Sequence, residues 1–173
     1  MSYIDGFVLA VPAANKDIYI AHASEGAALF RKLGATRLVE TWAEEVPHGK
    51  QTDFYRATKL EAGEVPLFSW VEYPDRATRM KAGQDMMNDP DMASMSEMPF
   101  DATRMIYGGF EVLNEIGARA KPGYVDAMIS PVPVANQEVY RAAAVAQAPL
   151  VMEHGGPPAQ AAAALLHDTA EDA

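Results

Sequence analysis

The chain has 173 residues, 49% of them hydrophobic, which suits one core with an appendage and is too short for two full-sized domains. Fourteen basic against 24 acidic side chains give a formal net charge of -10, so neither nucleic acid nor a membrane surface is expected as a partner. The absence of cysteine excludes disulfides and thiolate metal sites. Without a secretory leader or an apolar run of 18 residues, we expect a soluble cytoplasmic protein.

The first element predicted is a strand over residues 3–12, which alternate, are rich in Phe, Val and Leu, and end at Pro12. Asn15 then follows as the expected N-cap of a helix with Asp17 in its first turn. An apolar helix face is formed by residues spaced three or four apart, and Gly34 closes the helix as its C-cap. This face consists of Tyr19, Ala23, Ala27, Phe30 and Leu33.

Strand character returns in residues 36–45, and two further strand candidates follow, TDFYRATKLE (52–61) and VPLFSWVEY (65–73). Pro74 ends this hairpin system, Asp75 caps a second helix, and Asp89 with Pro90 stops that helix. The last strand predicted is RMIYGGFEVL (104–113), in which Gly108 and Gly109 indicate a bulge or a close backbone approach.

The order β-α-β-β-α-β predicts an α+β ferredoxin-like sandwich, a four-stranded antiparallel sheet with two helices on one face. Alternation places large side chains on the face away from the helices: Asp5, Phe7, Leu9, Glu40, Trp42, Phe68, Trp70 and Glu72. Because an apolar patch of this size marks an interface or a binding groove, we expect a homodimer of the dimeric α/β-barrel type, paired through this face.

Several motifs in order resemble one bacterial family: YIDGFVLAVP, VETW, VPHGKQTDF, FSWVEYP, DMMNDPDM and MPFDATRMIYGGFE. They are similar to the domain of unknown function 1428 family, the YbaA-like proteins, over residues 1–115. The resemblance implies the same ferredoxin-like dimeric α/β-barrel fold. It implies no established reaction and brings no catalytic residues.

The chain then repeats its own beginning, since residues 3–35 align without gaps to 124–156 and 12 of these 33 pairs are identical. The organisation expected is therefore a domain at 1–117, a linker at 118–123, a truncated repeat of the first strand and helix at 124–156, and an alanine-rich tail at 157–173. The tail's alanines favour helix with a frayed end. The repeat is either the remnant of a tandem domain or a purposeful extension, and it docks on its own domain, on the other subunit or in a swapped assembly.

Carboxylates walled by aromatic rings would have raised pKa values, which is how general acids and bases arise. The pocket candidates are Asp5, Glu40, Trp42, Trp70, Glu72, Arg104, Tyr107 and His48, the last in a turn at the rim. The alternative is that these acids lie at the rims of the sheet, form ion pairs with Arg37, Arg56 or Arg104, and only fix the sheet register. No cofactor is expected, since no nucleotide motif occurs.

No metal is expected either, because the spacing of the four histidines matches neither a zinc site nor a triad. Met92, Met95 and Met98, three apart, form a less favoured Cu(I) set, and methionine is also an adaptable core filler. The leading hypothesis is a protein that binds a small organic molecule in an aromatic and acidic pocket of the homodimer. The alternative is a non-enzymatic assembly or sensing module without a pocket.

Overall fold

A computed structural model describes residues 2–115, 123–154 and 164–166 of the chain. The model divides into two compact units, Met1–Gly109 and Phe110–Ala173. The first unit is built on a four-stranded sheet in the order β2-β3-β1-β4. The strands are β1 (Tyr3–Pro12), β2 (Arg37–Glu40), β3 (Glu64–Tyr73) and β4 (Ile106–Glu111). This order and the helix positions are those of the α+β ferredoxin-like fold, as predicted.

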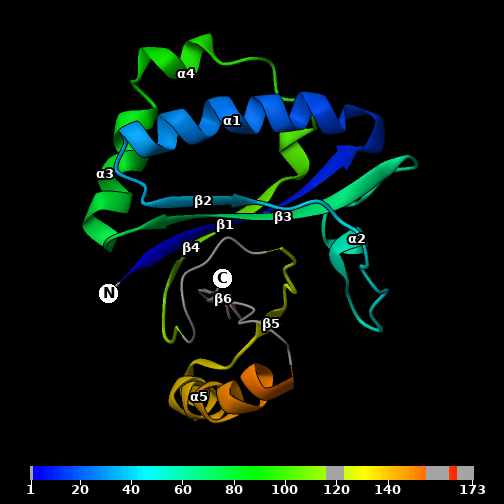
Figure 1. Cartoon of the computed structure of the whole chain (residues 1–173), viewed down its shortest axis with the longest axis vertical. Helices are drawn as coiled ribbons and strands as arrows, with labels where there is room; N and C mark the ends of the chain where they lie inside the picture. Colours follow the sequence, from blue (N-terminus) through cyan, green and yellow to red (C-terminus); the bar gives the residue numbers. More distant parts are fainter. Residues whose placement is uncertain (1, 116–122, 155–163, 167–173) are drawn as a thin grey trace, which may run out of the picture. The chain divides into compact units, whose positions relative to one another are not determined.

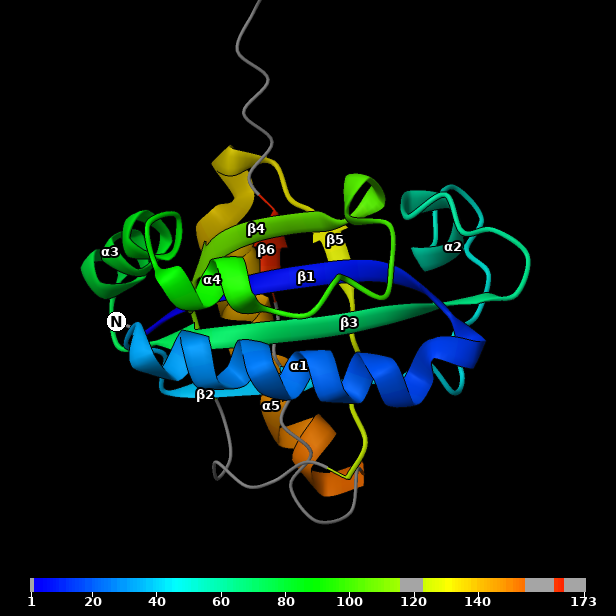
Figure 2. The same ribbon diagram turned by 90° about the horizontal axis from the view of Figure 1, so that it is seen from above.

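Helices α1 (Lys16–Lys32) and α3 (Arg76–Met86) lie on the same side of this sheet (Figure 1). Seen from above, α1 runs along β3 and β2, while α3 lies at the far end near β4 (Figure 2). A short helix α4 (Pro90–Ser94) follows α3. The main core lies between α1 and the sheet and consists of Leu9, Val11, Tyr19 and Leu67.

The two helix starts differ in how their N-caps are made. The Asp75 side chain accepts a hydrogen bond from the Thr78 backbone N–H, as expected for an N-cap. Asn15 occupies the N-cap position of α1 after a short 3-10 turn, η1 (Ala13–Asn15), but its side chain does not cap the helix. Instead its amide donates to the Pro99 carbonyl at 2.9 Å, which ties the start of α1 to the chain after α4.

Glycines occur where the backbone needs them at the end of α1 and in β4. Gly34 follows α1 with φ +100°, the left-handed conformation predicted for a C-cap glycine. A Cβ on Gly109 would lie 2.9 Å from a ring carbon of Tyr3 and 3.1 Å from an oxygen of Asp5. The close approach predicted for the glycine pair is thus confirmed at Gly109.

The prediction of a strand over 52–61 was wrong. Residues Phe54–Ala57 form a helical turn, α2, whose N-cap Asp53 accepts from the Arg56 backbone N–H at 2.8 Å. The first residues of this segment, TDF, carry an Asp in the N-cap position, and this local capping outweighs the alternation of the residues that follow. Strand β2 is correspondingly shorter than predicted and ends at Glu40.

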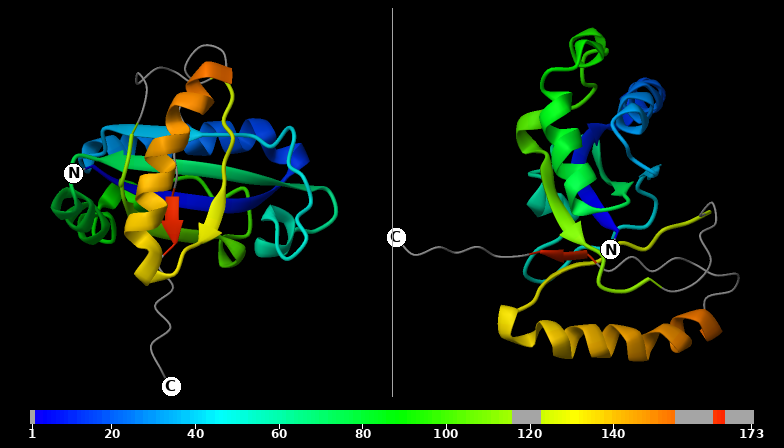
Figure 3. Two further views of the ribbon diagram at one scale, coloured as in Figure 1. Left: turned by 90° about the horizontal axis from the view of Figure 1, so that it is seen from below. Right: turned by 90° about the vertical axis from the view of Figure 1, so that its left-hand side faces the viewer.

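The second unit contains β5 (Ile129–Pro131), η3 (Val134–Asn136), α5 (Gln137–His154) and β6 (Ala164–Leu166), with β5 and β6 paired in parallel (Figure 3). The repeat in sequence is also a repeat in structure, because η3 and the start of α5 match η1 and the start of α1 residue for residue. Helix was favoured for the tail, whereas its one described segment, β6, is a strand. Most of the linker and the rest of the tail lie outside the described residues.

Candidate functional site

Strand register decides which candidate residues share a face. Gly6 of β1 pairs with Trp70 of β3, and Val39 of β2 pairs with Trp70 from the other side. The residues on the Trp70 face are therefore the even ones of β1 and the odd ones of β2, together with Phe68 and Glu72. They are Ile4, Gly6, Val8, Ala10, Arg37 and Val39.

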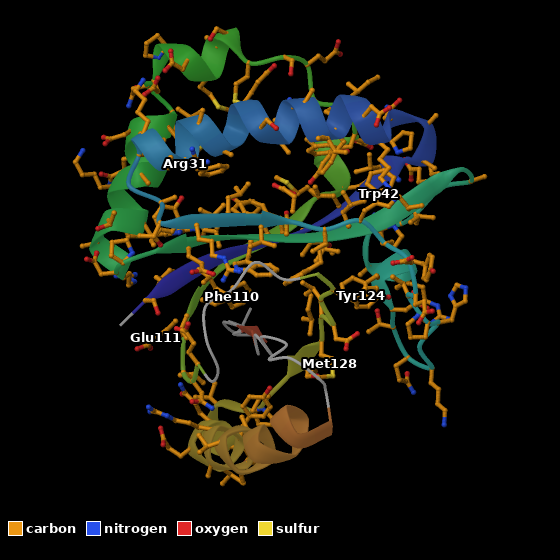
Figure 4. All side chains as sticks on the ribbon, in the orientation of Figure 1. Arg31, Trp42, Phe110, Glu111, Tyr124 and Met128 are labelled. Atoms are coloured by element: carbon orange, nitrogen blue, oxygen red, sulfur yellow. The ribbon has the colours of Figure 1, made fainter. Side chains whose placement is uncertain are left out.

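The predicted grouping of Asp5, Glu40 and Trp42 with Trp70 was wrong. These three residues lie on the helix side of the sheet, and Figure 4 shows Trp42 near the first turn of α1. Since side chains alternate along a strand, a shift of one residue in pairing moves a whole set to the other face. The prediction for β3 itself holds, because Leu67 and Val71 belong to the core beneath the helices.

On the helix side, the contact between Tyr19 and Glu40 is the best candidate for a functional site. The buried Tyr19 hydroxyl donates to Glu40 Oε2 at 2.5 Å, and the Ser69 side chain also hydrogen-bonds this pair. α1 supplies Tyr19, the end of edge strand β2 supplies Glu40, and the Cα partner of Glu40 across the sheet is Ser69. The geometry is that of a carboxylate fixed by two hydroxyls.

Burial raises the pKa of Glu40 above its ordinary value, and the hydrogen bonds from Tyr19 and Ser69 offset only part of this effect. The residue as a whole is exposed because it ends an edge strand, whereas its carboxylate packs against Tyr19. Burial also raises the pKa of Tyr19, with the Glu40 charge as the second cause. Both groups therefore keep their protons to a higher pH than they would in water.

Aromatic rings wall this pair on two sides. The Trp42 ring lies 6.2 Å from the Tyr19 ring at 57°, and the Phe100 ring lies 6.1 Å away at 56°. The Lys16 ammonium sits 5.2 Å from the centroid of Trp42, within cation–π range. We call Tyr19, Glu40, Trp42, Ser69 and Phe100 the Tyr19 cluster. It holds two of the predicted pocket residues, Glu40 and Trp42.

A second group on the helix side surrounds Asp5. Its carboxylate accepts from Arg79 Nε of α3 at 2.7 Å, and burial raises the pKa of Asp5 despite this ion pair. Burial, followed by the Asp5 charge, raises the pKa of Tyr73 to about 12. Nearby in β4, Tyr107 is 65% exposed and stacks on Phe7 at 6.3 Å. Asp5 thus forms an ion pair with an arginine, but with Arg79 and not with one of the three arginines that the structural alternative named.

Trp70 and Glu72 belong to the opposite face. The indole Nε1 of Trp70 donates to Glu72 Oε1 at 3.0 Å, and Arg37 Nη1 lies 3.3 Å from the same oxygen. The Arg37 guanidinium also lies 6.0 Å from the Trp70 ring centroid. These three residues lock the register of β2 on β3, and they are separated by the sheet from the Tyr19 cluster.

The last two pocket candidates have structural partners of their own. Arg104 forms a bidentate pair with Glu64 at 2.7 and 2.6 Å and also contacts Asp101 at 2.9 Å. His48 is exposed, stacks on Tyr55 at 4.4 Å and lies 3.3 Å from the Asp53 carboxylate in its own loop. Neither residue contacts the Tyr19 cluster through any of these interactions.

No group of three or more His, Asp or Glu side chains suited to a metal ion occurs in the part of the chain that the structure describes. Met95, central in the proposed Cu(I) set, lies with its methyl group 3.8 Å from the position of a Cβ on Gly26 of α1. This contact fits the adaptable packing role of methionine. Copper binding by Met92, Met95 and Met98 stays a prediction. Within the described ranges no helix is long and apolar enough to cross a membrane.

Sequence reasoning missed Tyr19, Ser69 and Phe100 as site residues. Tyr19 was assigned to the apolar helix face, which is correct, but its hydroxyl needs a partner once buried, and this requirement was the available signal. Ser69 in the middle of an apolar strand carried the same signal. Phe100 lies in a loop 81 positions from Tyr19, and no local pattern connects the two.

Comparison with known proteins gives a family without an assigned activity. The family model "Protein of unknown function (DUF1428)" matches residues 2–102. The uncharacterised protein YbaA of Escherichia coli K12 is 55% identical over 112 residues, which are 64% of this chain and 96% of that protein. YbaA of Shigella flexneri matches to the same extent.

Two solved structures are similar at low identity. SnoaB, a cofactor-independent oxygenase from Streptomyces nogalater, aligns with a TM-score of 0.35 and 12% identity over 71% of this chain and 98% of that one. A dimeric ferredoxin-like protein from an uncultured marine organism aligns with a TM-score of 0.36 and 10% identity over 63% and 92%. The family model covers more than half of the chain. The chain therefore belongs to the DUF1428 family of proteins of unknown function.

Proposed function

We propose that this protein binds a small organic molecule at the Tyr19 cluster, between α1 and the sheet, in the cytoplasm. The observation that carries the proposal is the 2.5 Å hydrogen bond from Tyr19 to Glu40, a carboxylate whose pKa burial raises, with Trp42 and Phe100 as walls. Ligand sites combine apolar aromatic walls with a few placed polar groups and perturbed pKa values. The Tyr19 cluster has all three features.

Two tryptophans on opposite faces of the sheet make a direct test possible. In Trp70→Phe the single remaining indole, Trp42, reports on the Tyr19 cluster, and in Trp42→Phe the remaining indole, Trp70, reports on the other face. We expect a metabolite library screened by fluorescence to contain compounds that quench the first variant and leave the second unchanged. Compounds that act only on the second variant, or on neither, would overturn the proposal.

A variant without the Glu40 charge provides a second test of the proposed binding site. Glu40→Gln keeps an oxygen for the Tyr19 hydroxyl but removes the carboxylate, so binding of a hit should weaken. The matched control is Glu45→Gln, which makes the same charge change on an exposed residue five positions away. Equal affinities of the two variants would show that Glu40 takes no part in binding.

An assembly role is the second candidate, and the apolar face opposite the helices favours it. Val8, Val39, Phe68 and Trp70 lie on this face, and we propose that it pairs with the same face of a second copy. Light scattering should then show a dimer that Val8→Lys dissociates. Ile20→Lys, a similar change at an exposed position of α1, is the control and should stay dimeric. A monomeric wild-type chain would refute the pairing.

A further inference from the structure

Residues 87–101 form a strap that runs antiparallel along α1: α4 lies farther from the sheet than α1 (Figure 1), and the strap passes beside α1 on the side of α3 and β4 (Figure 2). The contacts follow one another in order: Asp89 and Asp91 meet Lys32 near the end of α1, and Ser96 meets Glu25 and His22 in its middle. At the start of α1, the Asn15 amide donates to the Pro99 carbonyl. The strap, which includes α4, thus spans nearly the whole helix.

The contacts that hold the first part and the middle of the strap to α1 include several polar pairs, most of whose side chains are exposed. Lys32 Nζ lies 2.9 Å from Asp89 and 2.7 Å from Asp91, and half of the Lys32 side chain remains open to solvent. Glu25 accepts from the Ser96 backbone N–H at 3.0 Å and from its hydroxyl at 2.8 Å. Exposed ion pairs and hydrogen bonds of this kind contribute little net stability. These polar contacts are therefore inexpensive to break, while Met95, whose methyl group lies 3.8 Å from the position of a Cβ on Gly26, adds an apolar contact to α1.

The strap ends at Phe100, whose ring closes the Tyr19 cluster. Phe100 packs against the main core, 6.1 Å from the Tyr19 ring and 6.3 Å edge-on from His22. Trp42, two residues after the end of β2, also lies beside Tyr19, with the ring centroids 6.2 Å apart. Tyr19 therefore contacts one ring from the segment that follows β2 and one ring carried by the strap.

We propose that Phe100 is a displaceable plug and that the ligand of the Tyr19 cluster is a planar aromatic molecule bearing a hydrogen-bond donor. The inference rests on the proposed function and adds the ligand class. The ring of the ligand takes the place of Phe100 beside Tyr19 when the strap moves aside. Its donor group is received by the Glu40 carboxylate.

The polar groups of the Tyr19 cluster determine which hydrogen-bonding group the ligand must carry. Tyr19 and Ser69 both direct their hydroxyls at Glu40, and a carboxylate has about four lone-pair positions, so two remain for a further donor. A phenol or an amine satisfies such an acceptor, whereas a carboxylate ligand would bring a second negative charge against Glu40. The cluster should consequently bind phenols and aryl amines, and it should reject aromatic acids.

The test uses four ring compounds of similar size on the full-length Trp70→Phe protein, with Trp42 as the fluorescent reporter. These are 4-methylphenol, tyramine, 4-methylanisole, which lacks a donor, and 4-methylbenzoate, which is anionic. Expected affinities decrease from tyramine and 4-methylphenol to 4-methylanisole and then to 4-methylbenzoate. In Glu40→Gln, whose amide keeps one neutral acceptor oxygen, the preference for tyramine over 4-methylanisole should weaken while ring binding persists.

A second experiment removes the Phe100 ring and measures the effect on ligand affinity. Phe100→Ala should bind 4-methylphenol about tenfold more tightly, the gain expected if the closed state is populated about nine to one. Phe100→Leu, which keeps apolar bulk, serves where the alanine variant does not fold, and a smaller gain is expected. Lys32→Ala loosens the strap and should also raise affinity, whereas Lys81→Ala, which breaks an exposed pair with Asp85 on α3, should not.

The possible results separate the plug from the proposed function itself. If ring compounds quench Trp42 but the Phe100 and Lys32 variants bind no more tightly, the plug is refuted and the binding site stands. Binding seen only in Phe100→Ala supports the plug directly. A reversed order, with 4-methylbenzoate tightest, refutes the ligand class. No quenching of Trp42 in any variant refutes both proposals.

Discussion

Tyr19 and Glu40 are 21 residues apart in sequence and joined by a 2.5 Å hydrogen bond that ties α1 to the edge strand β2. Burial raises the pKa of Glu40 above its ordinary value of 4.5, so in the folded state the carboxyl keeps its proton to a higher pH than in the unfolded chain. Between these two pKa values the folded state binds more protons, and its stability decreases as the pH rises. Glu40→Gln, which is always uncharged, lacks this contribution.

The free energy of unfolding of the wild type relative to Glu40→Gln should therefore fall as the pH is raised through 4.5, and level off above the folded-state pKa of Glu40. Urea titrations of both proteins at intervals from pH 4 to pH 8 measure this difference. Glu45→Gln, at an exposed position outside the Tyr19 cluster, is titrated alongside as the control. A wild type that gains stability relative to Glu40→Gln with rising pH would show that the hydrogen bonds outweigh burial.

Gly109 should not tolerate a side chain. A Cβ there would lie 2.9 Å from Tyr3, 3.1 Å from Asp5 and 3.2 Å from Arg79, so Gly109→Ala must push apart the Asp5–Arg79 pair. We expect a loss of about 1–3 kcal/mol in the free energy of unfolding, as for overpacking elsewhere. Gly83→Ala is the control, because nothing lies within 4 Å of its Cβ and alanine favours the α3 helix by up to about 1 kcal/mol. Thermal or urea unfolding measures both, and equal behaviour would contradict the close approach.

Most of the fold could be predicted because its signals are local. The alternation of residues 3–12, the cap at Asp75 and the glycine at position 34 each identified an element that the structure contains. Residues 52–61 were predicted as a strand because their polar and apolar residues alternate. The side chain of Asp53 instead caps a helical turn at Phe54–Ala57, and this local hydrogen bond outweighs the alternation. Local chemistry therefore gave the element order but not every element.

The site was harder to predict because it depends on register and on long-range contacts. Glu40 and Trp42, both predicted as pocket residues, were placed on the wrong face, since one residue of register decides the face. Their role as pocket residues stays a prediction. The contact of Phe100 with Tyr19 comes from the path of the strap over α1, which no periodicity encodes. The arginine partners were partly foreseen: Arg104 and Arg37 were expected to pair with acids, whereas Arg79, the partner of Asp5, was not.

Arg104 should act as a clamp for stability and not for ligand binding. Its bidentate pair with Glu64 lowers the pKa of that carboxyl, so the pair stabilises the fold above the unfolded pKa of Glu64 and this contribution is lost as the pH falls through the folded one. Arg104→Gln should therefore destabilise the protein at pH 7 and much less at pH 3. Unfolding at the two pH values tests this, and ligand hits should bind the variant as they bind the wild type. If Arg104→Gln binds the ligand hits more weakly while its stability is unchanged, Arg104 takes part in ligand binding.

The first unit should fold without the extension that carries the repeat. A match of 112 residues covers 96% of YbaA, so the family domain exists elsewhere as nearly the whole protein. The sheet, both helices and the main core lie within residues 1–115 of this chain. A chain that ends at Glu115 is thus expected to unfold cooperatively and to keep the 2.5 Å Tyr19–Glu40 contact, so that Trp42 quenching by ligand hits is retained.

The same truncation tests the proposed dimer face. The residues around Trp70 on this face are large and apolar, and we propose that the same face of a second copy packs against them in the shorter chain as well. Light scattering should show a dimer for residues 1–115, and Val8→Lys in this shorter chain should give a monomer. A monomeric, soluble 1–115 chain that stays folded would mean that this face tolerates water and that the dimer proposal is wrong.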